Sequence, residues 1–281
     1  MRTYSFALLF SFIFISCEDL PTREADVEEV ISVSIKPPRL ITKTRPTHAV
    51  LQSSIRLNRN DFLGLGYTAD KKVSLDHLMQ PDFDYKSLGK RKPKYQDEVH
   101  LFVDYNQLLT MTSMYFSNDS SSYILPDSLI KRNWIQEYEK SDNLAFEKQQ
   151  EAYPLFIYNK SEDYTTLMLQ DGALILIQEA RDKYGNWRPI EYWEYSNNGN
   201  SYWEFEIFPN QFAVTKIYKY TGEFETELRI KLKSGSKVYY SNSFKGSIDP
   251  NQFDFDKETN LSRWIEKDPR TDLLLTLFLE R

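Results

Sequence analysis

Acidic side chains in two neighbouring strand-like stretches are the first residues of this chain that could do chemistry. Glu191 and Glu194 lie in one stretch, and Glu204 and Glu206 lie in the next. Two carboxyl groups that face each other roughly 5–10 Å apart can hydrolyse a glycosidic bond, one as the acid and the other as the nucleophile or base. Side chains on a strand alternate between its faces, however, and this pattern favours a solvated acidic face. A carbohydrate-active hydrolase that uses an Asp/Glu pair is therefore the alternative hypothesis.

The glycines, acidic loops and histidines predict no cofactor and no metal site. Gly64–Ala69 fits the relaxed dinucleotide fingerprint G-x-G-x-x-A. Polar residues flank it where a buried strand and a helix are needed, so we expect a glycine turn. Asp254–Glu258 has the alternate acids of a calcium loop, but Thr259 stands where glycine is required. The histidines are far apart and lack the spacing of a zinc motif: His48, His77 and His100.

Aromatic side chains make up 15% of the residues, and one run of them could carry binding. In strand geometry Trp187, Trp193 and Tyr195 share one face, while Ile190 and Tyr192 share the other. Whichever face enters the core, aromatic rings stay on the opposite side, and exposed apolar patches of this kind mark interaction sites. Packing in the core and across strands is the competing interpretation. The candidate ligand-binding residues are Trp187, Trp193 and Tyr195.

Cys17 is the only cysteine of the chain, and its position indicates acylation. It follows an apolar stretch, Phe6–Ile15, which has the length of a signal-peptide core and about half that of a membrane-spanning helix. Arg2 supplies the positive charge that begins such a signal, and Ser16 is the small residue expected before the cleavage site. With Cys17 acylated, the mature chain has no thiol for a disulfide, so its core alone must stabilise it.

The segment Phe14–Cys17 resembles the lipobox of bacterial lipoproteins, with an aromatic residue where leucine is usual. The acidic pair Glu18-Asp19 is similar to the export signal of Bacteroidetes surface lipoproteins. Residues 173–253 also resemble parts of uncharacterised exported proteins of that group. The resemblance implies a lipid anchor on Cys17 and a domain held at the outer membrane, facing either the periplasm or the cell surface.

The charge of the chain argues against nucleic acid as a partner. Lys and Arg number 35 and Asp and Glu number 41, which gives a net charge of -6 at pH 7, and there is no basic tract. The expected partners are the membrane, through the lipid anchor, and either a glycan or an envelope protein.

Alternating apolar and polar residues predict a mostly β fold. Strand-like stretches follow one another at 8–12-residue spacing after residue 155, which favours an antiparallel, immunoglobulin-like β-sandwich. In the clearest stretch, Thr226–Lys233, the expected inward residues are Leu228, Ile230 and Leu232. In Tyr202–Phe208 they are Trp203, Phe205 and Ile207. The other expected strands lie at 155–158, 165–169, 173–180, 187–195, 212–220, 238–240 and 273–279.

The preceding region is less regular and partly helical in this interpretation. We expect strands at 30–35, 50–57 and 99–103, and loops with short helical pieces over 58–98. The best helical stretch is Asp127–Tyr153, with Asp127 as its N-cap. Ser128 is also a candidate for O-glycosylation, because Asp127-Ser128-Leu129 is similar to the short acceptor pattern of Bacteroidetes glycoproteins.

These patterns divide the chain into four segments. They are a signal peptide over 1–16, a tether over 17–29, a mixed region over 30–154 and a β-sandwich domain over 155–281 that is of a size to fold alone. The favoured function is binding or scaffolding by a lipid-anchored protein of the cell envelope, without enzymatic activity.

The sequence predicts that a palmitate analogue fed to expressing cells labels the wild-type protein and leaves Cys17→Ala unlabelled. No other thiol exists in the chain, so label that persists in the variant would contradict acylation at this residue.

Overall fold

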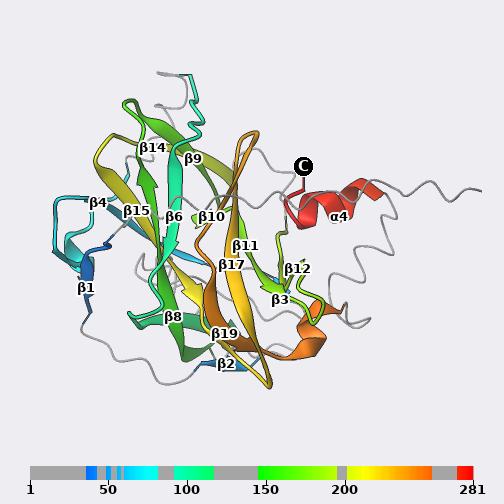
Figure 1. Cartoon of the computed structure of the whole chain (residues 1–281). Helices are drawn as coiled ribbons and strands as arrows, with labels where there is room; N and C mark the ends of the chain where they lie inside the picture. Colours follow the sequence, from blue (N-terminus) through cyan, green and yellow to red (C-terminus); the bar gives the residue numbers. More distant parts are fainter. Residues whose placement is uncertain are drawn as a thin grey trace, which may run out of the picture. The chain divides into compact units, whose positions relative to one another are not determined.

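The computed structural model describes residues 36–42, 49–51, 56–57, 60–81, 92–116, 145–194, 201–254 and 271–280. The chain divides into two compact units, Met1–Ile35 and Lys36–Arg281, and every described residue belongs to the second. The signal, Cys17, the tether, the strand expected at 30–35 and Ser128 lie outside the described residues. The second unit is built mainly from β-strands (Figure 1).

The first sheet is antiparallel, and its described strands are β4 (Asp61–Tyr67), β15 (Gln211–Tyr218), β8 (Ala145–Asn159), β6 (Val99–Val103) and β7 (Leu109–Phe116). Strand β8 pairs with β15 along one side and with β6 and then β7 along the other. Val103 lies opposite Leu155 and Leu109 lies opposite Ala152. Strands β6 and β7 therefore follow one edge of β8, and residues 104–108 loop out between them.

The second sheet is also antiparallel, and its described strands are β12 (Trp187–Pro189), β11 (Leu176–Arg181), β17 (Phe224–Ser234), β18 (Lys237–Tyr240) and β19 (Phe244–Ile248). A third sheet consists of β10 (Ala173–Leu174), β9 (Thr165–Gln170) and β14 (Tyr202–Ile207). Residues Leu101 and Ser241 form a bridge between the first two sheets.

Three short parallel pairs complete the described strands: β1 (Arg39–Ile41) with β5 (Lys72–Ser74), β2 (Val50–Leu51) with β16 (Tyr220–Thr221), and β3 (Arg56–Leu57) with β13 (Glu191–Tyr192). The helical elements are the 3-10 turns η1 (Leu75–His77) and η3 (Pro250–Phe253) and the helix α4 (Thr271–Leu277).

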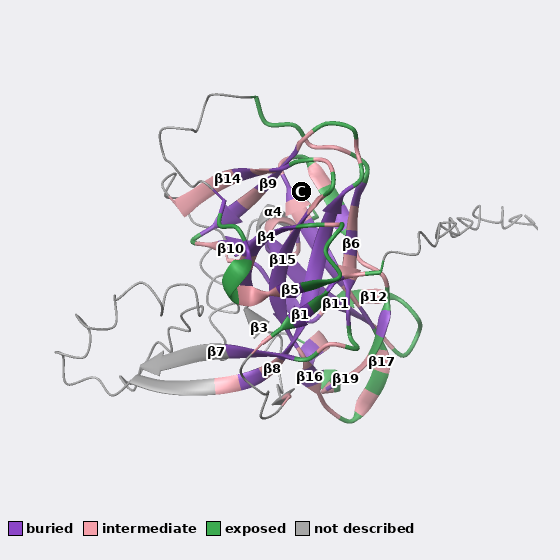
Figure 2. Ribbon diagram, turned by 90° about the vertical axis from the view of Figure 1, so that its left-hand side faces the viewer, coloured by how far each residue is buried: buried purple, intermediate pink, exposed green. Residues whose placement is uncertain are grey.

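The core is centred on β8 and β15, whose residues 152–159 and 212–218 are all buried (Figure 2). On one face of this pair, the Phe212 ring packs edge-on against Phe156, with centroids 5.4 Å apart. Gly66 lies opposite Phe212 in β4, and a Cβ there would come within 2.4 Å of the ring. A side chain at position 66 would therefore displace the ring, which explains a glycine inside a strand.

The prediction of a mostly β, antiparallel fold is confirmed, and the immunoglobulin-like arrangement stays a prediction. The strand expected at 99–103 is β6, with the same bounds. Within β17 the expected inward side chains are buried, namely Leu228, Ile230 and Leu232. Within β14, Phe205 and Ile207 are buried as expected, whereas Trp203 is half-buried.

Three local predictions are wrong. Residues 145–153, expected to end a helix, form the first part of β8, because β7 pairs along them. Residues 58–98, expected to be loops with short helical pieces, contain the strands β4 and β5, because β4 pairs with β15 and β5 with β1; the 3-10 turn η1 is a short helical piece as expected. Residues 273–279, expected to be a strand, include most of α4. Leu277 and Leu279 on this C-terminal segment are buried.

Strands from both sides of residue 155 share the first sheet. Residue 155 lies inside β8, and β15 hydrogen-bonds to β8 on one side and to β4 on the other. The expected boundary therefore falls in the middle of a central strand, and the compact unit extends from Lys36 to Arg281.

This pairing predicts that a fragment of residues 155–281 does not fold alone, contrary to the expectation from its length. The fragment would lack β4, β6 and β7 and would leave the edges of β8 and β15 unpaired. Far-UV circular dichroism should show no cooperative melt for this fragment and a cooperative melt for residues 36–281. A cooperative melt of the shorter fragment would show that its strands form a core without their N-terminal partners.

Candidate functional site

The candidate site lies where the extended segment at residues 36–42 crosses the loop between β6 and β7. Gln107 from this loop holds the segment in place, because its side-chain amide makes the two backbone hydrogen bonds that a neighbouring strand would otherwise make. The Oε1 atom of Gln107 accepts a hydrogen bond from the backbone N–H of Leu40 at 2.7 Å, and its Nε2 atom donates to the carbonyl of Pro38 at 3.1 Å. Backbone groups of β1 that pair with no strand on this side are thereby satisfied.

The loop that carries Gln107 is itself fixed by Asp104. The Asp104 carboxylate is buried, and it accepts hydrogen bonds from Gln107 Nε2 at 2.6 Å and from the backbone N–H of Asn106 at 3.1 Å. The backbone N–H of Asp104 donates to the carbonyl of Pro154 on β8. Strand β8 therefore holds Asp104, and Asp104 in turn holds the side chain of Gln107.

Strands β1 and β5 form a two-stranded parallel layer with one buried face. Leu40 lies beside Val73, and both side chains are buried. Arg39 lies beside Lys72, and both side chains are exposed. Leu78, which comes directly after η1, lies against Gly64 of β4, where an added Cβ would approach the Leu78 Cβ to 3.0 Å. The polar side of this layer faces solvent because its apolar side covers the first sheet.

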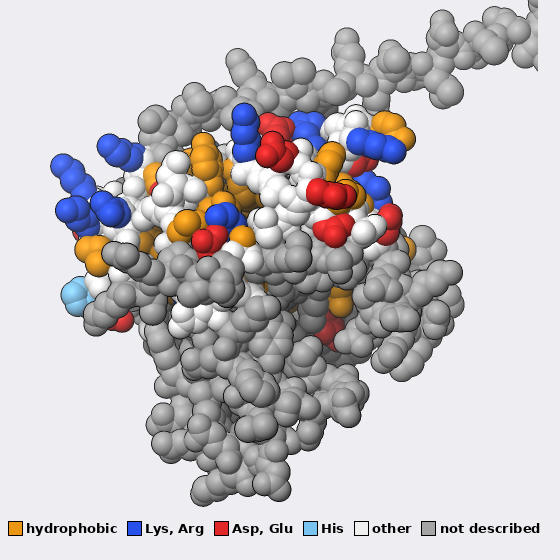
Figure 3. All heavy atoms as spheres, turned by 90° about the horizontal axis from the view of Figure 1, so that it is seen from below, with side chains coloured by type: hydrophobic (Ala, Val, Ile, Leu, Met, Phe, Trp, Pro, Cys, Tyr) orange, Lys and Arg blue, Asp and Glu red, His pale blue; other side chains and the backbone are white. Residues whose placement is uncertain are grey.

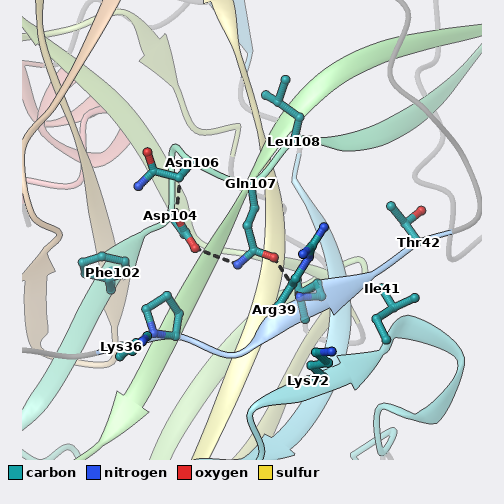
Figure 4. A pocket seen from close by; sticks show the side chains of 12 residues that line it. Lys36, Arg39, Ile41, Thr42, Lys72, Phe102, Asp104, Asn106, Gln107 and Leu108 are labelled. Atoms are coloured by element: carbon teal, nitrogen blue, oxygen red, sulfur yellow. Dashed lines mark hydrogen bonds between the residues drawn. The ribbon is translucent and has the colours of Figure 1, made fainter.

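A pocket of about 760 Å³ opens between this layer and the loop (Figure 4). Its wall combines charged, amide and apolar side chains, and the residues that line it are Lys36, Pro37, Arg39, Leu40, Ile41, Thr42, Lys72, Phe102, Asp104, Asn106, Gln107 and Leu108. In Figure 4 the dashed hydrogen bonds of Gln107 run across the middle of the site, between Asp104 and the β1 backbone.

The lining carries three cations and one carboxylate. Lys36, Arg39 and Lys72 are exposed, and in the described part of the chain their side chains have no ion-pair partner. Asp104 is buried and hydrogen-bonded within its own loop. Figure 3 shows Lys and Arg side chains gathered at its left, the side on which Figure 1 places β1. The pocket is thus locally cationic in a chain whose net charge is -6.

The aromatic site predicted from the sequence is not assembled as expected. Trp193, expected on an exposed face, is only 6% exposed, and its indole N–H donates to Gln170 Oε1 at 2.9 Å. It belongs to a buried cluster with Leu279, because α4 and the residues after it cover this part of the sheet. Tyr195 lies outside the described residues.

Trp187 is half-buried, and two arginine side chains make cation–π contacts with its ring. The guanidinium groups of Arg181 and Arg229 lie 4.7 and 4.3 Å from the ring centroid. Arg229 also lies 4.1 Å from the ring centroid of Tyr240. These contacts leave less of the Trp187 ring for stacking against a sugar, so binding there stays a prediction that the geometry does little to support.

The four acids expected on a solvated face are not all solvated. Glu191 is fully buried and accepts hydrogen bonds from the backbone N–H of Gln178 at 2.8 Å and from the Tyr220 hydroxyl at 2.5 Å. Its solvated placement is therefore wrong, because the Glu191 side chain is held inside by Gln178 of β11 and Tyr220 of β16. The other three acids are half-buried: Glu194, Glu204 and Glu206.

Glu204 accepts a hydrogen bond from the Tyr95 hydroxyl at 3.1 Å. Burial, followed by the charge of this carboxylate and the hydrogen bond to it, raises the pKa of Tyr95 to about 12. The Tyr95 phenol therefore stays neutral over the physiological pH range and donates to Glu204, which is the chemistry of a structural contact.

The glycine and histidine motifs lead to no site. Gly64–Ala69 spans the end of β4 and the start of the turn after it, rather than the glycine turn expected, and the next element is the strand β5. His77 is exposed in η1, and His100 is half-buried on β6, where burial and the charge of Lys160 lower its pKa. No group of metal-ligating side chains occurs among the described residues, and His48 lies outside them. Of Asp254–Glu258, only Asp254 is described, and it is exposed.

Comparisons with known proteins add no identification. No family model, no curated protein and no solved structure matches this chain. No helix within the described ranges has the length and apolar character needed to cross a membrane.

Sequence reasoning missed the pocket because its residues carry no shared pattern. Arg39, Lys72 and Gln107 are far apart along the chain, and only parallel pairing and a side-chain amide bring them together. The one available signal was that the loop after Val103 is rich in polar residues, which also describes many ordinary turns.

The amide bridge predicts that Gln107→Ala lowers the free energy of unfolding by about 1–3 kcal/mol, because it removes bonds to Leu40, Pro38 and Asp104 together. Urea denaturation of the variant and the wild type measures the difference. Asn106→Ala is the matched control, since only the backbone of Asn106 is hydrogen-bonded to Asp104. Equal losses in the two variants would mean that loop composition, not the amide bridge, governs stability here.

Proposed function

We propose that this chain is a lipid-anchored protein of the cell envelope that binds a small ligand in the pocket between β1, β5 and residues 104–108, without altering it chemically. The pocket carries the proposal. Its volume of about 760 Å³ falls in the range of small-molecule sites. Two of its polar side chains, Gln107 and Asp104, are held in position by hydrogen bonds before any ligand arrives.

The composition of the lining favours binding over catalysis. A paired-acid hydrolase needs two carboxyl groups that converge on the substrate. Asp104 is the one carboxylate among the twelve lining residues, and both of its oxygens already accept hydrogen bonds within the loop. The hydrolase alternative would have to use acids elsewhere, and Glu191 is committed to Gln178 and Tyr220.

The lipid anchor rests on the residues around Cys17, together with the acidic tether that follows it. A thioether-linked diacylglycerol and a short unpatterned linker would hold the folded unit close to the membrane surface. The ligand would then be a component of the envelope or a solute that passes it, and a saccharide fits the size of the pocket.

The proposal is tested by saturation-transfer NMR of the purified full chain with two saccharide probes, digalacturonate and maltose. At least one probe should receive saturation from the protein and should remain intact on prolonged incubation. Ile41→Trp, at the pocket rim, should abolish the transfer by filling the site, whereas Tyr184→Trp on an exposed turn should not.

Two results would contradict the proposal. Transfer that survives in Ile41→Trp would place binding elsewhere, and the absence of transfer to both probes would remove the support for a saccharide-binding pocket. Cleavage of either disaccharide by the wild type would favour the hydrolase.

A further inference from the structure

We infer that the pocket between β1, β5 and residues 104–108 selects ligands that carry a compact oxyanion, a phosphate ester or a carboxylate, bound between Arg39 and Lys72. This inference rests on the proposed function, that the pocket binds a small ligand. It adds the chemical class of that ligand and the residues that recognise it.

The register of β1 and β5 brings two positive charges together. Arg39 and Lys72 are direct neighbours across the parallel pair, as are Ile41 and Ser74 two residues further on. Neighbouring side chains on adjacent strands lie about 5 Å apart at their Cβ atoms, and like charges at that separation destabilise the pair. An oxyanion between the two side chains would replace this repulsion by two attractions.

Several cations of the described chain have carboxylate partners, whereas others, such as Lys71 and Lys183, have none there. Lys216 pairs with Asp61 at 3.1 Å, Lys219 with Glu151 at 2.6 Å, and Arg229 with Glu179 at 2.7 Å. Arg39 and Lys72 have none within the described ranges, although acids outnumber basic residues in the chain.

The groups around the two cations fit an anion that is attached to an organic body. Lys36 adds a third positive charge, while Asp104 adds one negative charge that is buried and directed at Gln107 and Asn106. The lining therefore keeps a positive balance. Ile41 and Leu108 are exposed at the rim, at 50% and 39%, and supply apolar contact for a sugar ring or a carbon chain.

Arg39 is the group that gives this site its preference for oxyanions. A guanidinium presents its N–H donors in a planar fork that matches two oxygens of a phosphate or a carboxylate, whereas an ammonium acts as a point charge. Together the two side chains would engage a doubly charged phosphate better than a neutral hydroxyl of similar size.

The test is thermal unfolding of the full chain with inorganic phosphate, glucose 6-phosphate, digalacturonate or maltose, each at the same ionic strength. A bound anion should raise the Tm by about 5–10 °C at a hundredfold excess over its Kd, while maltose should shift it less. Lys72→Glu should lose the anion-dependent shift. Without ligand its own Tm should be equal to or above that of the wild type, because the like-charge contact with Arg39 becomes an opposite-charge contact.

Lys71→Glu is the matched control, since Lys71 is also exposed and adjacent in sequence but does not line the pocket. It should keep the anion-dependent shift. A shift retained in Lys72→Glu, or lost equally in both variants, would overturn the inference, because general charge screening would then explain it. Arg39→Gln serves as a second variant that changes no strand register, and it should also abolish the shift.

The probes also separate the two sources of oxyanion and the two proposals. A shift with glucose 6-phosphate alone identifies a phosphate ester, and a shift with digalacturonate alone identifies a carboxylate. A shift with maltose and with neither anion overturns the oxyanion inference and leaves the binding function standing. No shift with any probe contradicts both.

Discussion

Strands β8 and β15 hydrogen-bond side by side while neither of their faces reaches water, since residues 152–159 and 212–218 are all buried. Antiparallel sheets usually expose one face, so an antiparallel pair buried on both faces needs a covering layer on each side. On one side Phe62 of β4 packs against Phe205 of β14, with ring centroids 5.0 Å apart. On the other side the cover comes from Leu78 and the segment around β1 and β5. The N-terminal segments are therefore part of the core and not an appendage.

Burial on both faces also forces polar residues into the interior, where each needs a partner. Lys216 of β15 is buried and pairs with the buried Asp61 at 3.1 Å. Asn60 accepts from the Leu174 backbone and donates to its carbonyl, which ties β4 to β10. Such groups give little net stability, but removal of one partner leaves a buried charge or dipole unsatisfied. They therefore specify which strand lies next to which.

Alternation and apolar runs located many of the strands, including the fully buried β15, but they failed at the start of β8 and in the C-terminal segment. β17 has apolar residues on one face and mostly charged residues on the other, β6 has one buried apolar face, and both strands lie where the sequence predicts them. The start of β8 is rich in Gln, Glu and Lys and resembles a helix, but pairing with β7 makes it a strand. In the C-terminal run of leucines, a short apolar segment satisfies either period, and packing against Trp193 decides for a helix.

The candidate site was beyond periodicity for a related reason. Strand alternation groups Trp193 with Trp187 as candidate binding residues, but the strand stops at Tyr192 and the carbonyl of Leu277, the last residue of α4, accepts a hydrogen bond from the Trp193 backbone N–H. Glu191 was expected in water, yet contacts with Gln178 and Tyr220, distant in sequence, hold it inside. Long-range contacts of this kind leave no local signature. The same holds for Arg39 and Lys72, whose proximity exists only because β1 and β5 pair in parallel.

The layer formed by β1 and β5 has two roles: one face covers the first sheet, and the other face lines the candidate pocket. Leu40 and Val73 face the core, and this fixes Arg39 and Lys72 on the outer side, because side chains on a strand alternate. Selection for stability alone would favour opposite charges at these neighbouring positions. A like-charge pair retained next to a preformed pocket is the kind of local cost that natural proteins carry at functional sites. The layer that completes the core thereby also places the charges that we propose meet the ligand.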